Sequence, residues 1–407
     1  MTGPSLLAGP DLRAGMESAA GHLSRLGPLP PGAASLIDVL ERSGLRGRGG
    51  AAFPVARKWR AVAERRGARP VVLVNGAEGE PLSRKDRVLM ETRPHLVLDG
   101  ALLAAGALGA GEVLLYVGAE HAAAATALGR ALAERPEAER RRVRTVAAPP
   151  RYVAGEESAA VRFVNDGVAL PTVTPPRPSE RGVGGRPTLV QNVETLAHVA
   201  MVARFGDAWF RGLGAPGTPG TALLTVTGAV ARPGVLEVAQ GSALGDAVAA
   251  AGGLSDRAGA VLLGGYFGGW VGAEEAWGLR LDAPGLRSAG HSLGCGVVAV
   301  LPGHRCGVVE TARILTHLAG QSARQCGPCV FGLAAIAGAV QRIAAGTAEA
   351  DDLERVRRWS GELRGRGACA HPDGAAGLLL SALRTFGDDF LHHHRHGGCA
   401  VATREAA

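Results

Sequence analysis

The chain has 407 residues, a length that is enough for roughly two to four domains. Hydrophobic residues make up 46% of it and aromatic residues only 4%, so sizeable cores can form. Its net charge of +7 is modest, and no run of Lys and Arg is interleaved with aromatic residues, so we expect no nucleic-acid partner. Neither a secretory signal nor a membrane span is visible, which predicts a cytoplasmic protein that is not itself transmembrane.

Residues 1–40 have the pattern of a helical lead-in made of short amphipathic pieces. A glycine-rich stretch follows, in which Gly47, Gly49 and Gly50 surround Arg48. Glycine lets a backbone approach a ligand closely, and successive free N–H groups form a cradle for anions. With Lys58 on the helix that follows, the stretch predicts a nucleotide or flavin phosphate site. An Arg- and Gly-rich surface turn is the alternative.

Strands and helices then alternate. We expect strands at 71–74, 112–117 and 141–146, with helices at 96–107 and 121–135 between them. This alternation predicts a doubly wound parallel sheet. The first strand ends in a polar turn, and the carboxyl ends of parallel strands are where open α/β sheets bind ligands. The turn contains Asn75, Glu78 and Glu80.

Two further polar clusters stand at expected helix starts. Gly155, Glu156 and Glu157 form the first, and adjacent acids suit the positive end of a helix dipole. The alternative is a pair of acids that bonds a cofactor or substrate. The second cluster, Gln191 to Thr195, opens an apolar helix that we expect to run to about residue 203.

The pattern changes after a Gly/Pro linker at 214–220. Strands at 223–228 and 235–238 and a helix at 243–251 indicate a small α+β module. Helical patterns at about 310–345, 351–364 and 374–394 indicate a C-terminal helical bundle. The histidines at 392–396 could bind a metal, but a solvated helix end is the favoured interpretation.

The six cysteines predict cofactor ligands or buried thiols instead of a disulfide framework. Cys326 and Cys329 form a C-G-P-C tetrad, and Cys369 lies farther along. A thioredoxin-like dithiol would need this tetrad after a strand, and none is expected there. Iron–sulfur ligation is the other interpretation. Cys295, Cys306 and Cys399 fall outside the motif and are not expected to be ligands.

In their order, these stretches resemble the flavin- and NADH-binding subunit family of bacterial NADH:quinone oxidoreductase (complex I) and of related NAD-linked hydrogenases and formate dehydrogenases. The similarity covers nearly the whole chain from about residue 30. It implies a Rossmann-like FMN-binding domain at 41–213 after the lead-in at 1–40. A β-grasp soluble-ligand-binding (SLBB) domain at 221–303 and a helical iron–sulfur bundle at 306–407 would follow.

The resemblance also implies the site residues. The cofactor-binding residues would be Gly47, Arg48, Gly49, Gly50, Phe53, Lys58, Asn75, Glu78, Glu80, Gly155, Glu156, Glu157, Gln191, Asn192 and Thr195, with Phe53 on the nicotinamide side. An iron–sulfur cluster would bind to Cys326, Cys329 and Cys369. No side chain is expected to act as a general acid or base.

The chain departs from the family pattern at the cluster. The family has C-x-x-C-x-x-C before the distant fourth cysteine, and here the first position is Ala323. A [4Fe–4S] cluster would need a water, His371, Ser322 or another residue as its fourth ligand, and a [3Fe–4S] cluster or an empty site are alternatives.

The nicotinamide side departs as well. Phe53 remains, but the lysine and phenylalanine of the family's Lys-Pro-Pro-Phe-Pro stretch are missing in residues 174–178. Ala61 and Ala77 stand where an aromatic residue and an acid are expected. The resemblance therefore implies FMN and leaves NADH open.

The resulting function is FMN-dependent electron transfer, in which electrons pass through an iron–sulfur cluster to a partner, and NADH is a candidate donor of hydride. That partner would be a thioredoxin-like [2Fe–2S] subunit or a ferredoxin-like carrier. The alternatives are a non-catalytic partner-binding module, a ferredoxin-linked flavoprotein that does not use NADH, and a dithiol protein using Cys326 and Cys329.

Overall fold

A computed structural model describes residues 4–65 and 67–399 of the chain. The chain forms two compact units. The first comprises Met1–Leu224 and Val235–Ser242, and the second comprises Thr225–Gly234 and Ala243–Ala407.

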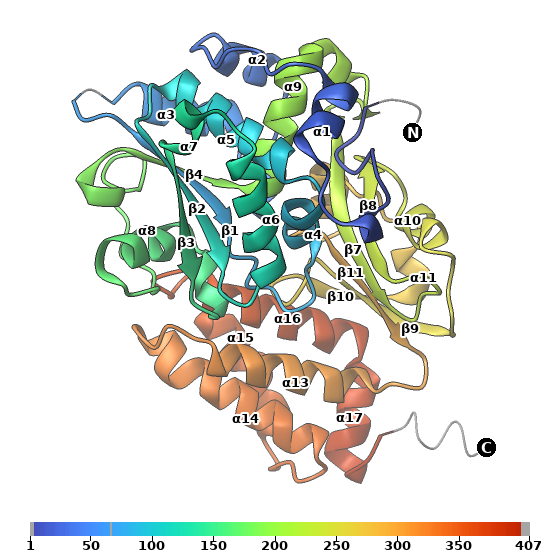
Figure 1. The fold of residues 1–407 in the computed structure, drawn as a ribbon. Helices are drawn as coiled ribbons and strands as arrows, with labels where there is room; N and C mark the ends of the chain where they lie inside the picture. Colours follow the sequence, from blue (N-terminus) through green and yellow to red (C-terminus); the bar gives the residue numbers. More distant parts are fainter. Residues whose placement is uncertain (1–3, 66, 400–407) are drawn as a thin grey trace. The chain divides into compact units, whose positions relative to one another are not determined.

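A four-stranded sheet forms the centre of the first unit. Its strands are β1 (Val71–Gly76), β2 (Glu112–Gly118), β3 (Val143–Ala148) and β4 (Thr188–Asn192). They lie in the order β3-β2-β1-β4, and all neighbours are parallel (Figure 1). The parallel sheet predicted from the sequence is confirmed, whereas β4 was not expected as a strand.

Both faces of this sheet are buried. Val72 and Val74 of β1 belong to one apolar core, and Val71 and Leu73 belong to another. This division follows from the alternation of side chains along a strand. Burial on both faces explains why β1 is a continuous apolar run.

The helices of the first unit surround the sheet (Figure 1). They are α1 (Ala19–Leu26), α2 (Leu36–Ser43), α3 (Val55–Ala63), α4 (Lys85–Thr92), α5 (Pro94–Leu108), α6 (Ala122–Ala133), α7 (Glu137–Arg140), α8 (Glu157–Asp166) and α9 (Val193–Arg211). Short 3₁₀ turns are η1 (Leu12–Ala14), η2 (Tyr152–Gly155) and η3 (Val183–Gly185), and a short hairpin joins β5 (Gly214–Ala215) to β6 (Thr218–Pro219). Helix α9 is interrupted at Gly206, whose φ of 84° and ψ of 166° are not helical, so its first continuous part ends close to the expected end near residue 203.

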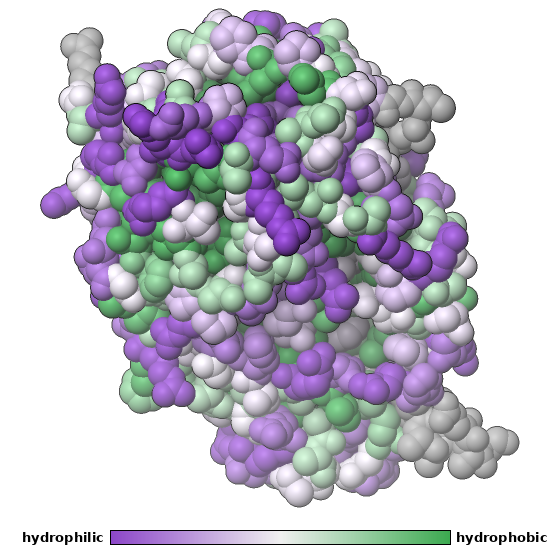
Figure 2. All heavy atoms as spheres, in the orientation of Figure 1, coloured by the Kyte–Doolittle hydropathy of each residue, from purple (hydrophilic) through white to green (hydrophobic). Residues whose placement is uncertain are grey.

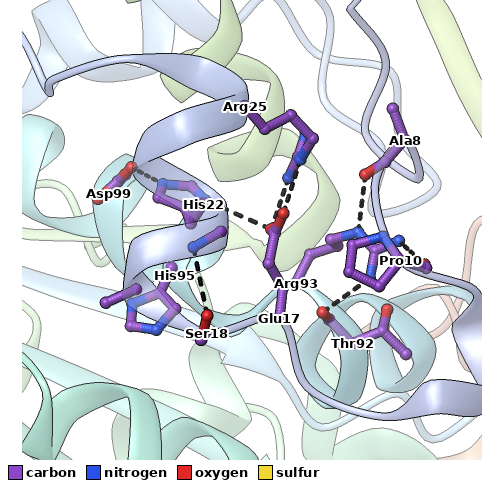
Figure 3. A network of polar contacts seen from close by, with 12 residues as sticks. Ala8, Pro10, Glu17, Ser18, His22, Arg25, Thr92, Arg93, His95 and Asp99 are labelled. Carbon is purple, nitrogen blue, oxygen red and sulfur yellow. Dashed lines mark hydrogen bonds and ion pairs between the residues drawn. The ribbon is translucent and has the colours of Figure 1, made fainter.

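Buried charges fix the N-terminal segment to α5 (Figure 3). His22 Nε2 lies 2.7 Å from Asp99 Oδ2, and Arg25 makes two hydrogen bonds to Glu17. The guanidinium of Arg93 donates to backbone carbonyls of the segment, including that of Ala8 at 2.9 Å. Asp99 is fully buried, and His22, Arg135 and Arg204 replace its lost hydration.

The five-stranded sheet has the order β10-β9-β11-β7-β8. Its strands are β7 (Thr221–Gly228), β8 (Gly234–Ala239), β9 (Ala258–Leu263), β10 (Gly269–Gly272) and β11 (Val297–Pro302), and the boundary between the units runs through β7. Strand β11 pairs in parallel with β7 and antiparallel with β9. The helices α10 (Leu244–Ala250), α11 (Ala273–Ala276) and α12 (Ala283–Ser288) connect these strands.

The remaining helices of the second unit are α13 (Gly307–Gly320), α14 (Leu333–Ala344), α15 (Asp352–Leu363), α16 (His371–Thr385) and α17 (Gly387–His396). The single helical stretch expected at 310–345 is wrong, because the chain leaves the helix after Gly320 and re-enters through a π-helical turn, η4 (Pro328–Gly332). The stretch expected at 374–394 is likewise divided at Phe386.

None of the described helices combines the length and the apolar run that a membrane crossing requires. On the face drawn in Figure 2, polar and hydrophobic side chains are intermixed. Among the described residues, the two most exposed large hydrophobic side chains are those of Val173 and Phe331, each at 75%.

Candidate functional site

The switch point of the parallel sheet lies between β1 and β4. The chain continues from β1 to β2 and β3 on one side, and β4 lies on the other side. Asn75 near the end of β1 is the register partner of Asn192, which ends β4. Open α/β sheets bind ligands outside the carboxyl ends of their strands at such a point. This edge therefore brings together two polar clusters that are far apart in the sequence.

The glycine loop between α2 and α3 is held against this edge. The backbone N–H of Arg48 donates to Thr195 Oγ1 at 2.9 Å. A side-chain carbon at Gly49 would lie only 3.3 Å from Asn192 Cβ. Position 49 therefore accepts no larger residue without a shift of Asn192.

The loop has the backbone geometry of an anion cradle. Its ends are joined by a hydrogen bond from the Gly47 N–H to the Phe53 carbonyl at 2.9 Å. Gly50 and Ala52 have positive φ values of 107° and 49°. In the described part of the chain, no protein acceptor takes the N–H groups of residues 49–52. Several free N–H groups in a turn of this kind bind an anion.

The Arg48 side chain is used elsewhere. One guanidinium nitrogen donates to the Thr221 carbonyl at 2.8 Å, and Nε lies 3.8 Å from Glu194 Oε1. Burial lowers the pKa of Arg48, against the opposing effect of Glu194. The structure therefore uses both the guanidinium and the backbone N–H of Arg48 to support the loop.

Lys58 provides the exposed cation at this edge. Its ammonium lies 2.5 Å from Glu157 Oε2, and both side chains remain about a third exposed or less, at 27% and 35%. The neighbouring Trp59 is fully buried and donates through Nε1 to Gln191 Oε1 at 3.3 Å. Helix α3 thus presents Lys58 to solvent while Trp59 fixes the helix against β4.

Asn192 is oriented from both sides of its amide. Its Oδ1 accepts the Thr195 N–H at 3.2 Å, and its Nδ2 donates to Asp86 Oδ2 at 2.7 Å. Asn75 is held by a 2.7 Å hydrogen bond from Nδ2 to the Gly155 carbonyl. Both side chains are thus fixed at the switch point.

A buried charge cluster supports this arrangement. Lys85 Nζ lies 2.9 Å from Asp86 Oδ1 and 2.8 Å from Glu194 Oε2. Burial alone would raise the pKa of Glu194, but Lys85, His198 and Arg48 lower it to about 2. The ionised carboxylate also accepts the Leu223 N–H at 2.8 Å.

Two of the predicted acids cap helices. Glu78 accepts the N–H groups of Asp86 and Arg87 in the first turn of α4 at 3.0 and 2.8 Å, and burial and Asp86 raise its pKa to about 7. Glu156 accepts the N–H groups of Ser158 and Ala159 at the start of α8. Of the two alternatives for the adjacent acids, an acid at a helix start therefore describes Glu156.

Neither Glu80 nor Phe53 caps a helix, and the two side chains have different surroundings. Glu80 accepts the Tyr152 hydroxyl at 2.8 Å through Oε2. Phe53 is 43% exposed, and the Arg57 guanidinium lies 5.6 Å from its ring centroid. Phe53 therefore leaves an aromatic face near the loop accessible to a ligand.

Cys326, Cys329 and Cys369 interact electrostatically in the second unit. Burial raises the pKa of Cys329 to about 12, and Cys326 and Cys369 add to this rise. The pKa of Cys326 is lowered despite burial, because the backbone at Ala368 and Cys329 bonds its sulfur. The segment beside Cys369 is thus in contact with Cys326. The element before the tetrad is a helix, α13, whereas a thioredoxin-like dithiol motif would follow a strand.

The proposed alternatives for a fourth ligand differ in their surroundings. His371 is buried and its Nε2 lies 2.7 Å from the Leu318 carbonyl. Ser322 is 6% exposed, and its Oγ has no hydrogen-bond partner among the described residues. Ala323, at the position of the family's first cysteine, is also buried.

A second group of side chains that could bind a metal ion lies in the second unit. One ligand atom each from Cys306, His393 and Cys399 lies within 4.8 Å of the others. His393 is 2% exposed, so the expectation of a solvated histidine tail is wrong for this residue. The sequence pattern does not predict this grouping, because its members are distant in sequence. Their residue types were the only signal.

Comparisons with known proteins follow the same order of domains. The family model described as Nuo51 FMN-binding domain matches residues 40–201, and the SLBB domain matches 223–265. The NADH-ubiquinone oxidoreductase-F iron-sulfur binding region matches 310–393.

Individual proteins match over most of their length. The second F-type subunit of the NADH-quinone oxidoreductase of Rhizobium meliloti (strain 1021) is 33% identical over 89% of this chain and 90% of its own. The F-type subunit of the Mycobacterium bovis enzyme is 31% identical over 93% of this chain and 88% of its own. A crystal structure of NAD+-reducing [NiFe]-hydrogenase in the H2-reduced state has a TM-score of 0.83 at 32% identity, covering 94% of this chain and 70% of that one.

Proposed function

Because the chain belongs to the family of F-type subunits of NADH-quinone oxidoreductase, we propose that it is a flavin-dependent oxidoreductase of the NADH dehydrogenase type. It passes electrons from FMN through an iron–sulfur cluster to a partner carrier. Bound FMN supplies the conversion between two-electron and one-electron transfer. The residues of the chain bind and orient it.

The observation that carries this proposal is the backbone cradle at the switch point. The free N–H groups of residues 49–52 fit the oxygens of a phosphate, and Lys58 supplies a cation beside them. A ligand phosphate would compete with Glu157 for the Lys58 ammonium. Gly49 keeps the approach clear.

We assign the flavin contacts to those side chains that are held in place but do not cap a helix. Asn75 and Asn192 present amides at the ends of β1 and β4, and Glu80 and Glu157 contribute carboxylates nearby. Glu78 and Glu156 act by fixing the first turns of α4 and α8. Their role is to position the turns that contact the flavin.

For the cluster, we propose Cys326, Cys329 and Cys369 as cysteine ligands and Ser322 as the fourth. Burial raises the pKa of Cys329, and the nearby charges of Cys326 and Cys369 raise it further. The unpartnered Ser322 hydroxyl is buried, and such a group is costly unless it gains a partner. His371 is disfavoured because its Nε2 already bonds the Leu318 carbonyl.

We propose that the five-stranded sheet is the β-grasp domain and that the four-stranded sheet belongs to a Rossmann-like FMN domain. The last strand, β11, lies in the centre of its sheet and parallel to the first, β7. The division into domains at 41–213, 221–303 and 306–407 and a cytoplasmic location stay predictions.

The partner is proposed to be a thioredoxin-like [2Fe–2S] subunit or a ferredoxin-like carrier that docks near the cluster. Val330 and Phe331 directly follow Cys329 and are 44% and 75% exposed. Exposed apolar residues of this kind suit a protein contact. The net charge of +7 favours an acidic carrier.

A second function, a flavoprotein that does not use NADH, is favoured by one observation. The stretch at 174–178 lacks the lysine and phenylalanine of the family, and Ala61 replaces a further aromatic residue, whereas Phe53 is kept and is 43% exposed. Each lost aromatic stack weakens nicotinamide binding by about 1 kcal/mol, or roughly fivefold.

The test is flavin analysis followed by stopped-flow reduction. Anaerobically purified protein should release FMN on heating, and FAD or no flavin after reconstitution with FMN would contradict the proposal. NADH reduction at rates and affinities like those of an intact nicotinamide site would exclude the second function.

A further inference from the structure

Three ligand-type side chains outside the flavin and iron–sulfur motifs form a compact group in the second unit. Cys306 Sγ lies 3.2 Å from His393 Nε2. One ligand atom from each of Cys306, His393 and Cys399 lies within 4.8 Å of the other two. The group shares no residue with the set Cys326, Cys329 and Cys369.

The spacing fits a single ion. In a tetrahedral zinc site, with Zn–S near 2.3 Å and Zn–N near 2.0 Å, neighbouring ligand atoms lie roughly 3.5–3.8 Å apart. The distance of 3.2 Å needs only a small outward movement of either side chain to accept zinc. An iron–sulfur cluster would hold its ligands farther apart, because iron and sulfide atoms lie between them.

The ligand types select the metal. Two thiolates and one imidazole are soft and intermediate donors, which suit zinc, and no carboxylate belongs to the group. Three protein ligands leave a fourth tetrahedral position for a water molecule.

The fold brings the ligands together from both ends of the helical region. Cys306 is the N-cap of α13, and His393 lies in the last turn of α17. Cys399 follows the end of α17, where the chain turns at Gly397 in the left-handed conformation. An ion bound here would join the first helix of the region to the segment after the last.

The His393 side chain is enclosed by the fold, because the residue is only 2% exposed. Its Nδ1 is buried and has no hydrogen-bond partner among the described residues, whereas its Nε2 lies 3.2 Å from Cys306 Sγ. The ring therefore presents Nε2 to the group.

We propose that Cys306, His393 and Cys399 bind one zinc ion, which staples the start of α13 to the end of the described chain. This site does not take part in electron transfer and does not depend on the presence of FMN or of the iron–sulfur cluster. Zinc has no redox chemistry, so the ion would carry no electrons. We assign it a structural role because it would join the start of α13 to the segment after α17.

The experiment is metal analysis of the full chain, purified anaerobically and reduced before zinc is added. The wild-type protein should retain about one zinc per chain after gel filtration. Cys306→Ser, His393→Gln and Cys399→Ser should each lose it. The matched control is Cys295→Ser, because Cys295 bonds the Gly264 carbonyl and lies outside the group. Cys326→Ser should lose iron and keep zinc.

A spectroscopic readout on the wild-type protein covers the case in which a variant fails to fold. Cobalt substituted for zinc should give thiolate-to-cobalt charge-transfer and intense tetrahedral bands. The proposal is overturned if the reduced wild-type chain takes up neither zinc nor cobalt. It is also overturned if Cys306→Ser and Cys399→Ser retain zinc as fully as Cys295→Ser does, or if only Cys326→Ser loses it.

Discussion

Lys58 Nζ lies 2.5 Å from Glu157 Oε2 and thereby connects α3 to the first residue of α8 at the edge where the parallel strands end. The pair is partly exposed, and partly exposed ion pairs contribute little to folding stability, about 0–1 kcal/mol. An ammonium that can exchange Glu157 for a phosphate is suited to ligand binding.

We therefore expect Lys58→Ala to weaken FMN binding by roughly 10- to 100-fold, because a hydrogen bond to a charged group contributes about 1.5–3 kcal/mol. The free energy of unfolding of the apoprotein should change by less than about 1 kcal/mol. Flavin fluorescence titration and urea unfolding measure the two quantities.

The matched control for Lys58 is Arg60→Ala. Arg60 is a cation on the same helix but pairs with Asp38 and Glu41. Its removal should leave FMN affinity unchanged. Equal loss of affinity in both variants would show that general positive charge, and not a specific contact, attracts the ligand.

The second prediction concerns Gly49. A side chain there would meet Asn192 Cβ at 3.3 Å and enter the cradle, so Gly49→Val should abolish detectable FMN binding. Gly129→Ala in α6 is the control, because a Cβ there has nothing within 4 Å. Normal FMN content in Gly49→Val would show that the phosphate does not enter this loop.

The sequence predicted the first three parallel strands because their apolar runs are long and are separated by helical patterns. It did not predict β4, which has only the five residues Thr188–Asn192 and ends in two polar ones. Pairing with β1 stabilises this strand, and such pairing is a tertiary effect that local pattern does not contain.

The sequence predicted which residue types form the candidate site, but it did not predict the role of each residue. Glu78 and Glu157 are both acids in glycine-rich turns, yet one caps α4 and the other pairs with Lys58. The group of Cys306, His393 and Cys399 was not predicted for a similar reason. His393 lies among histidines that suggest a solvated tail, and only the packing of α17 shows that it is buried.

The third prediction is a pH dependence of stability that arises from the buried cluster in Figure 3. Burial alone would lower the pKa of His22, but the hydrogen bond with Asp99 and the nearby carboxylate of Glu17 raise it overall. Asp99 also faces Arg135 and Arg204, at 2.6 and 2.5 Å. Burial would raise the pKa of Asp99, but His22 and the arginines lower it to about 2.

The sign follows from these directions. A raised His22 pKa stabilises the fold fully below about pH 6.5, and this contribution is lost as the pH rises through the folded-state pKa. A lowered Asp99 pKa stabilises above about pH 4, and this contribution is lost as the pH falls toward 2. The free energy of unfolding should therefore decline on both sides of this window.

Urea unfolding from pH 5 to 9 tests the His22 part. His22→Gln should be less stable than wild type at pH 5, and the difference should shrink as the pH rises. His304→Gln is the control, because His304 forms an exposed pair with Asp256. A difference between wild type and His22→Gln that is constant with pH would contradict the assignment.

The last prediction concerns the fourth cluster ligand. The Ser322 hydroxyl is buried without a hydrogen-bond partner among the described residues. If it serves only the fold, its removal should be neutral or stabilising, since no bond is lost. If it binds iron, Ser322→Ala should lower iron and sulfide per chain and increase the three-iron form, without loss of stability in the cluster-free protein.

Ala323→Cys should act in the opposite direction, because it restores the family's C-x-x-C-x-x-C spacing with Cys326 and Cys329. It should stabilise a four-iron cluster against oxygen and rescue the cluster in the Ser322→Ala background. Ser288→Ala is the control, because that hydroxyl already donates to the Gly285 carbonyl at 2.8 Å. Electron paramagnetic resonance with and without dithionite distinguishes the forms. An unchanged spectrum in Ser322→Ala would exclude serine as a ligand, and a failure of Ala323→Cys to restore iron would remove this loop from the route of electron transfer.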